Sequence, residues 1–194
     1  MKKFIVLMLI LMVSVSVFAF DMGKFTVGIS FGISGSSEKS VKNGTTQVSS
    51  GKFGFVVRLR GDYMINDSMS ATLMVSYDSP SKTVLQSTFL KSNSEIQSPK
   101  YIKIFAGISK YSTNENLLIA AGVGPELAID VVNGSVGGGA ATYVRTSYSL
   151  PGSNLLVDST AVGEAEWIKD VPNDDDTHFY LDGNASVGFT YCFK

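Results

Sequence analysis

Residues 179–193 read FYLDGNASVGFTYCF, and their alternation is the clearest structural signal in the chain. Every second residue is apolar, aromatic or small, starting from Phe179 and ending at Phe193. The residues between them are mostly polar or small, from Tyr180 to Cys192. This period of two predicts a β-strand with two different faces. A tilted strand of about 9–11 residues crosses the hydrocarbon core of a membrane, so this one is long enough to span it.

The same alternation recurs seven times upstream. The further predicted strands lie near 24–34, 53–63, 68–78, 100–111, 117–130, 140–150 and 154–168. Residues 82–91 also alternate, but a ninth strand would leave the two chain ends on opposite sides of a barrel, so we assign them to a loop. The sequence therefore predicts an all-β fold, an eight-stranded antiparallel up-and-down transmembrane β-barrel.

The predicted connections alternate in length along the chain. The longer ones lie near 35–51, 79–99, 131–139 and 169–177. The shorter ones lie near 65–67, 112–116 and 151–154, and they carry Asn, Asp, Pro and Gly, which are good turn formers. Short turns at one end, longer loops at the other and an even strand count are typical of outer-membrane barrels.

The N-terminus has the pattern of an export signal. Lys2 and Lys3 precede an apolar run over residues 4–18, and Ala19 provides a small residue for cleavage. This predicts a cleavable signal peptide over residues 1–19 and one barrel domain over residues 20–194. The alternative is a retained membrane helix, but the run is short for a span of about 20 residues.

The two faces of the strands distinguish a membrane barrel from a soluble one. One face carries Ile, Val, Phe and Leu, while the other carries small residues such as Gly28, Ser30 and Gly122. A soluble exported barrel, such as a lipocalin-like binder, would need a polar face large enough to meet water. The small face suits a crowded interior instead, so we expect the aliphatic face to meet lipid.

Aromatic residues provide an independent test of this arrangement. When the strands are threaded up and down, the outward-facing aromatic residues collect at the two ends, where two aromatic girdles are expected. The predicted girdle residues are Phe25, Tyr63, Tyr148, Tyr191 and Phe193 at the periplasmic end, and Phe53, Tyr77, Trp167 and Phe179 at the external end.

With these features, residues 20–194 resemble the small outer-membrane proteins of the OmpA-barrel and OmpX-like group. The resemblance implies a monomer in the bacterial outer membrane, with outer-membrane lipid and the barrel-assembly machinery as partners. Phe189, Tyr191 and Phe193 resemble the C-terminal signal that this machinery reads. That signal usually ends on the aromatic residue itself, whereas here Lys194 follows.

Charged residues fall on the inward face, where the resemblance implies an ion-pair network that plugs the barrel. The residues are Arg58, Arg60, Asp62, Lys103, Glu126, Arg145, Asp158, Glu164, Glu166 and Asp182. We expect Arg58 and Arg145 near mid-depth, with Glu126 and Glu164 as partners. An eight-stranded barrel is just wide enough for side chains to fill, so we expect no wide pore. The alternative is a narrow solute path.

Other chemistry has weak support in the sequence. A net charge of −1 with 17% charged residues excludes the basic footprint of a nucleic-acid binder. The single His178 and single Cys192 argue against a multi-histidine metal site and an intrachain disulfide. His178 lies beside the acidic run 174–176, but Phe179 follows it where a lipid-deacylating barrel has serine. We therefore expect no catalytic residue, cofactor or metal site, and a solvated loop at 174–176 in preference to a cation site.

The predicted function is a structural or surface-interaction barrel without a wide pore. Loops 35–51 and 79–99 are expected to meet host or envelope ligands. One alternative is a small OmpW-like barrel that transports ions or apolar solutes, and another is a lipid A-modifying membrane enzyme. Conductance in planar bilayers separates the first two.

Overall fold

The computed structural model describes residues 25–42, 45–80, 100–114, 116–132, 134–169 and 177–193. The predicted signal peptide and the alternating segment 82–91 lie outside these residues. The eight strands are β1 Phe25–Lys42, β2 Thr45–Asn66, β3 Met69–Pro80, β4 Tyr101–Asn114, β5 Leu117–Asp130, β6 Val136–Ser149, β7 Leu155–Lys169 and β8 Thr177–Cys192.

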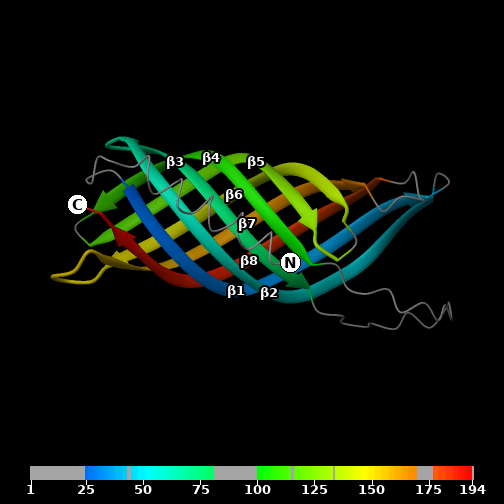
Figure 1. The fold of residues 1–194 in the computed structure, drawn as a ribbon, viewed down its shortest axis with the longest axis horizontal. Coiled ribbons are helices and arrows are strands. Elements are labelled where there is room, and N and C mark those ends of the chain that lie inside the picture. The colour runs from blue at the N-terminus through cyan, green and yellow to red at the C-terminus, as the bar shows by residue number, and fades with distance from the viewer. Residues whose placement is uncertain are drawn as a thin grey trace.

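The strands form one closed barrel in sequence order (Figure 1). Each strand pairs antiparallel with the next, and β1 pairs with β8 in a register that runs from Thr26↔Cys192 to Lys39↔Phe179. The predicted eight-stranded antiparallel barrel is therefore confirmed. Among the described residues, no helix is long and apolar enough to cross a membrane.

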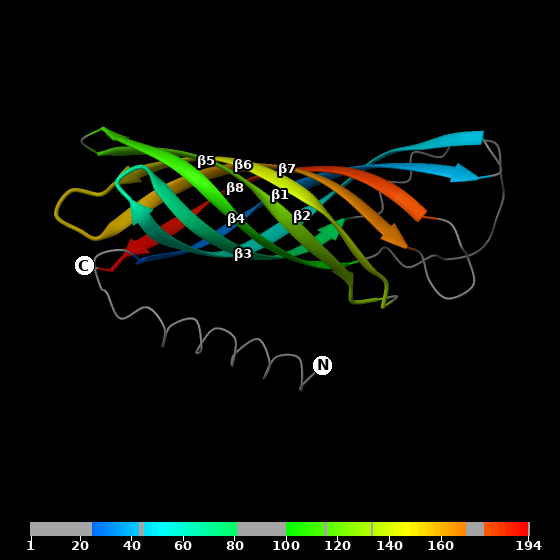
Figure 2. The same cartoon turned by 90° about the horizontal axis from the view of Figure 1, so that it is seen from above.

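The two ends of the barrel differ, and we name them by their connections. The turn end holds the first residues of β1 and the last residues of β8. There Phe193 N donates to Phe25 O at 3.1 Å. The connections after β2, β4 and β6 lie at the same end and are short. The loop end holds the connections after β1, β3, β5 and β7, and the β1–β2 hairpin projects beyond the barrel there (Figures 1 and 2).

The predicted loop at 35–51 is wrong, because β1 and β2 continue through most of it. Their register extends to Lys42↔Thr45, past an irregularity between Ser36 and Glu38. The intervening dipeptide, Asn43-Gly44, lies outside the described residues, but Asn-Gly is the strongest short hairpin signal in a sequence. As a hairpin signal, this dipeptide accounts for the greater length of both strands.

The predicted loop at 131–139 is also too long, because β6 begins at Val136. Three successive glycines, 137–139, have low strand propensity and therefore favoured a loop. Here they permit close backbone packing. A Cβ built on Gly139 would lie 2.0 Å from the carbonyl oxygen of Ala165 on β7, so this position in the strand excludes a side chain.

The side chains alternate between an apolar exterior and a polar interior. Outside, Ile33 is 67% exposed and Val187 is 65% exposed, whereas inside, Asp62 and Glu166 are 0% exposed. A soluble barrel has the reverse arrangement. In lipid only closed barrels and helices satisfy every backbone group, and an apolar outer band suits the hydrocarbon. The predicted assignment of faces is correct in all eight strands.

Candidate functional site: the charged interior

The ten charged residues predicted to face inward all lie inside the barrel. Nine are at most 7% exposed as whole residues, and the tenth, Asp182, has a side chain that is 6% exposed. Buried charges are tolerated only when they are paired and hydrogen-bonded. The structure brings most of them together in two groups at different depths, each supported by neighbouring hydroxyl or amide side chains.

The first group, the turn-end network, consists of Arg60, Asp62, Arg145 and Asp158. Asp62 Oδ2 accepts from Arg60 Nε at 3.0 Å and from Arg145 Nη1 at 2.8 Å. Arg60 Nη2 reaches across to Asp158 Oδ2 at 2.9 Å. Two guanidinium groups therefore meet two carboxylates, and the network is formally neutral.

Hydroxyl groups add further hydrogen bonds to the turn-end network, although Asp158 Oδ1 and Arg145 Nε have no hydrogen-bond partner among the described residues. Thr26 Oγ1 donates to Asp62 Oδ2 at 3.1 Å, and Thr72 Oγ1 donates to Asp62 Oδ1 at 2.8 Å. The Tyr143 hydroxyl lies 2.8 Å from Thr72 Oγ1. Thr190 donates to Asp158. Asp62 thus accepts from four side chains, which offsets the cost of burying its charge.

The second group, the loop-end network, consists of Lys103, Glu126, Glu164, Glu166 and Asp182. Lys103 Nζ lies 2.5 Å from Glu164 Oε2, 2.7 Å from Asp182 Oδ2 and 3.0 Å from Glu166 Oε1. One ammonium group therefore forms ion pairs with three carboxylates. The fourth carboxylate, that of Glu126, is buried beside them. This network has an excess of acid.

The predicted partners Glu126 and Glu164 form no direct ion pair with Arg58 or Arg145, although they are the acids that interact most strongly with Arg58 through space. Arg145 pairs with Asp62, as above, and Arg58 Nη1 donates to Ser186 Oγ at 3.1 Å. Arg58 Nη2 also donates to Asn184, whose Nδ2 donates in turn to Glu164 Oε1 at 2.9 Å. Arg58 therefore reaches the loop-end network through an amide. Alternation alone cannot give the registers that decide these partners.

Two apolar clusters divide the interior further. Met74, Phe105, Tyr143 and Val162 belong to one, in which the rings of Phe105 and Tyr143 meet edge to face at 5.9 Å. The other contains Tyr101, Ala128, Ile168 and Tyr180. Along β7 the inward order is Asp158, Thr160, Val162, Glu164, Glu166 and Ile168, so ionic and apolar layers alternate from the turn end to the loop end.

The predicted girdle residues lie in two groups at the two ends. At the turn end, the Phe193 ring lies 5.9 Å from Phe25 and 5.0 Å from Tyr191. Tyr63, Tyr148 and Tyr191 are 46–49% exposed there. At the loop end, Trp167 is 55% exposed and its ring lies 5.1 Å from that of Phe179 at a tilt, while the Tyr77 ring lies 5.9 Å from that of Phe55. Phe53 is 64% exposed at the same end.

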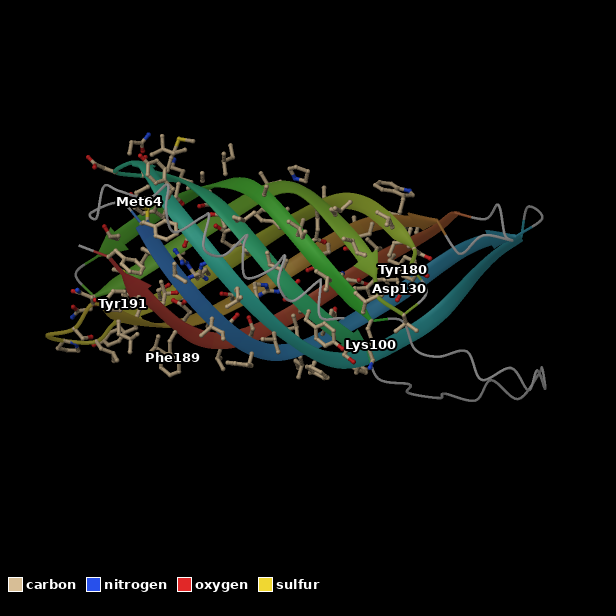
Figure 3. All side chains as sticks on the ribbon, viewed as in Figure 1. Met64, Lys100, Asp130, Tyr180, Phe189 and Tyr191 are labelled. Atoms are coloured by element: carbon tan, nitrogen blue, oxygen red, sulfur yellow. The ribbon has the colours of Figure 1, made fainter. Side chains whose placement is uncertain are left out.

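The residues of the predicted assembly signal point outward near the end of β8. Phe189 is 52% exposed, and Phe189 and Tyr191 lie on the outer surface at the turn end (Figure 3). Asp130 and Tyr180 lie at the opposite end of the barrel in the same view. Cys192 is half-buried at the turn end. The acidic run 174–176 and the side chain of His178 lie outside the described residues.

No protein-family model matches the chain, and no curated protein matches it in sequence. The solved structures that share its fold include AlkL, Neisserial surface protein A and OprG. The outer membrane protein AlkL, solved in DMPC lipid bilayers, is 13% identical with a TM-score of 0.55, covering 91% of this chain and 92% of AlkL. Neisserial surface protein A is 16% identical with a TM-score of 0.51, covering 87% and 97%.

The outer membrane protein OprG from Pseudomonas aeruginosa is 14% identical with a TM-score of 0.51, covering 87% of this chain and 96% of OprG. At these identities the likeness concerns the fold, which is that of the small outer-membrane β-barrels, as the sequence resemblance implied. The three similar structures are surface or outer-membrane proteins, in agreement with the predicted localisation in the bacterial outer membrane.

Proposed function

We propose that this chain is a structural or surface-interaction barrel of the outer membrane, with no wide pore and no enzymatic activity. The filled interior carries the proposal. Buried ionic networks and apolar clusters occupy successive depths, and the large side chains of Arg145, Lys103 and Phe105 are all less than 2% exposed. An eight-stranded barrel filled in this way leaves little room for a solute.

Planar-bilayer conductance tests the absence of a pore. We expect the purified full chain to show no reproducible openings, with a general porin reconstituted in the same lipid as the positive control. Regular single-channel steps from the wild-type barrel would contradict the proposal and favour the alternative of an ion-transporting barrel.

The projecting β1–β2 hairpin supports a role at the surface. The β2–β3 register starts at Gly54↔Pro80, so residues 45–53 pair with β1 beyond the described part of β3. Such a ribbon adds little to the closure of the barrel. Replacing residues 40–47 with Asn-Gly should therefore leave heat-modifiable gel migration unchanged, whereas loss of the folded band would assign the ribbon to the folding of the barrel.

The absence of enzymatic activity is tested separately in cells. Exchange of His178 for Ala, the substitution that would inactivate a histidine-dependent lipid hydrolase, should leave the composition of lipid A unchanged. A difference in acylation between wild type and variant would overturn this part of the proposal.

A further inference from the structure

Three glutamates from two strands converge inside the loop-end network. Glu126 on β5 and Glu166 on β7 share a row with Gly139 of β6 between them, in the register Glu126↔Gly139↔Glu166. Because Gly139 has no side chain, nothing from β6 separates the two carboxylates. Glu164 lies one inward position further toward the turn end. One carboxylate oxygen from each of the three lies within 4.8 Å of the other two.

This spacing fits three ligands on one cation. Calcium binds carboxylate oxygens at about 2.3–2.6 Å, so two ligands on opposite sides of it lie about 4.6–5.2 Å apart and adjacent ligands lie closer. The three oxygens fall inside that limit. The three glutamates can therefore supply three of the roughly six to eight oxygen ligands that calcium takes, beside the Lys103 ammonium group.

Several carboxylate oxygens of this network have no hydrogen-bond partner among the described residues. They are Glu126 Oε1, Asp182 Oδ1 and both oxygens of Glu166. The carboxyl groups of Glu126 and Glu166 lie within hydrogen-bonding reach of each other, but two ionised carboxylates have no proton to donate. Glu166 Oε1 lies 3.0 Å from Lys103 Nζ, but only as an ion pair without hydrogen-bond geometry. Glu166 is 0% exposed and Glu126 is 7% exposed. A buried polar atom without a partner is costly, so such atoms in one place point to a ligand.

The charge balance points the same way. In the loop-end half, Asp78 lies one row from Lys103 and accepts from Ser34 Oγ at 2.6 Å. Together with the four carboxylates of the loop-end network, it brings the acids to at least five against two cations, Lys103 and Arg58. The turn-end network, by contrast, is balanced. A divalent cation among the glutamates would remove two charges of the excess.

We propose that Glu126, Glu164 and Glu166 bind a calcium ion inside the barrel. Carboxylate oxygens are ligands for hard cations, and a site built by buried protein groups suits calcium better than magnesium, which keeps several of its waters. Lys103 and Asp182 border the site, and Lys103 holds the Glu164 and Glu166 carboxylates in place. This site goes beyond the proposed function, and the sequence had predicted no metal site.

Calorimetric titration of the full chain, folded in detergent and stripped with chelator, tests the proposal. We expect one calcium ion per chain with a Kd below about 1 mM and weaker binding of magnesium. Calcium should also raise the temperature at which the folded band is lost in heat-modifiable electrophoresis. Glu126→Gln keeps the shape of the side chain and removes one ligand charge, so it should weaken calcium binding by at least ~10-fold.

The matched control is Asp67→Asn, which removes the same charge from an exposed turn. It should leave calcium affinity unchanged, and the difference between the two variants separates the site from calcium held by detergent or surface acids. If Glu126→Gln does not fold, Glu166→Gln takes its place. A folded wild type that binds no calcium at ~10 mM overturns the proposal, as does equal affinity in wild type and either glutamine variant. Shared protons between the glutamates would then explain the buried acids.

Discussion

The two ionic networks inside the barrel use the same kinds of side chain but differ in their balance. At the turn end, Arg60 and Arg145 meet Asp62 and Asp158, and threonine hydroxyls donate to both carboxylates. Of the buried polar atoms in these four side chains, only Asp158 Oδ1 and Arg145 Nε lack a hydrogen bond within the part of the chain that the structure describes. At the loop end, Lys103 alone contacts three carboxylates, and several oxygens there lack a hydrogen bond among the described residues.

The two networks therefore differ in how far their own side chains balance their charges. A guanidinium group stays charged at any ordinary pH, so the turn-end network needs carboxylate charge, above all that of Asp62, which both guanidinium groups share. A buried carboxylate can instead be neutralised by a proton or a cation. We therefore expect the turn-end network to act as a fixed structural plug and the loop-end network to respond to cations added to the solution.

The largest effect is expected at the turn end, from Asp62→Ala. This change leaves two buried guanidinium groups without their shared carboxylate, so we expect a loss of about 3–5 kcal/mol in the free energy of unfolding. Urea unfolding in detergent micelles measures it. A loss of less than ~1 kcal/mol is typical of exposed ion pairs. It would mean that the turn-end network does not depend on Asp62 in the way proposed.

Lys103→Met, at the loop end, should cost less, about 2 kcal/mol, because the carboxylates that lose their ammonium can take up protons. If the glutamates bind calcium, added calcium should restore part of the loss in this variant, whereas it should restore none in Asp62→Ala. The same urea titration, with calcium or with chelator, distinguishes these results. Equal behaviour of the two variants would mean that the networks respond alike.

Asp158→Asn should have a smaller effect, about 1 kcal/mol. The amide oxygen still accepts from Thr190, and Arg60 keeps its bond to Asp62 at 3.0 Å. The losses in unfolding free energy of Asp158→Asn, of Arg60→Met and of the double variant together give the coupling energy between the two positions. Additive losses would show that the 2.9 Å contact between them contributes little.

The smallest effect on stability is expected from Glu126→Gln in the presence of chelator. Removing one charge from an excess of acid relieves repulsion, so we expect no loss and a gain of at most ~1 kcal/mol. Thermal unfolding followed by gel migration measures the change. A clear loss of stability would show that the Glu126 carboxylate makes a favourable ion pair or hydrogen bond that glutamine cannot replace.

The strands and their faces followed from the sequence because period-two alternation is a local property. Positions 179–193 predicted β8, and the same pattern placed Lys103 and Glu166 inside. The two errors in extent had local causes. The predicted loop 35–51 contains Asn43-Gly44, which is a hairpin signal, and the glycines at 137–139 have low strand propensity although their strand packs closely against β7.

The partners inside the barrel did not follow from the sequence. Arg58 bonds to Asn184 and Ser186, which are more than 120 positions away in the chain. Their inward positions were predictable from the alternation. The pairing needs the β1–β8 register and the lengths of the arginine side chains. The approach of Glu126 to Glu166 likewise depends on a glycine in the strand between them.

The pairing of β1 with β8 has a consequence for the order of folding. Thr26 lies opposite Cys192, so the last contacts to close the ring join segments separated by most of the chain. Contacts between such distant segments form slowly, because a long loop must first lose its freedom. Until β8 is in place, β1 presents a row of unpaired amide and carbonyl groups that can pair with another chain. The seam between the first and last strands is therefore where this molecule is most exposed to aggregation while it folds.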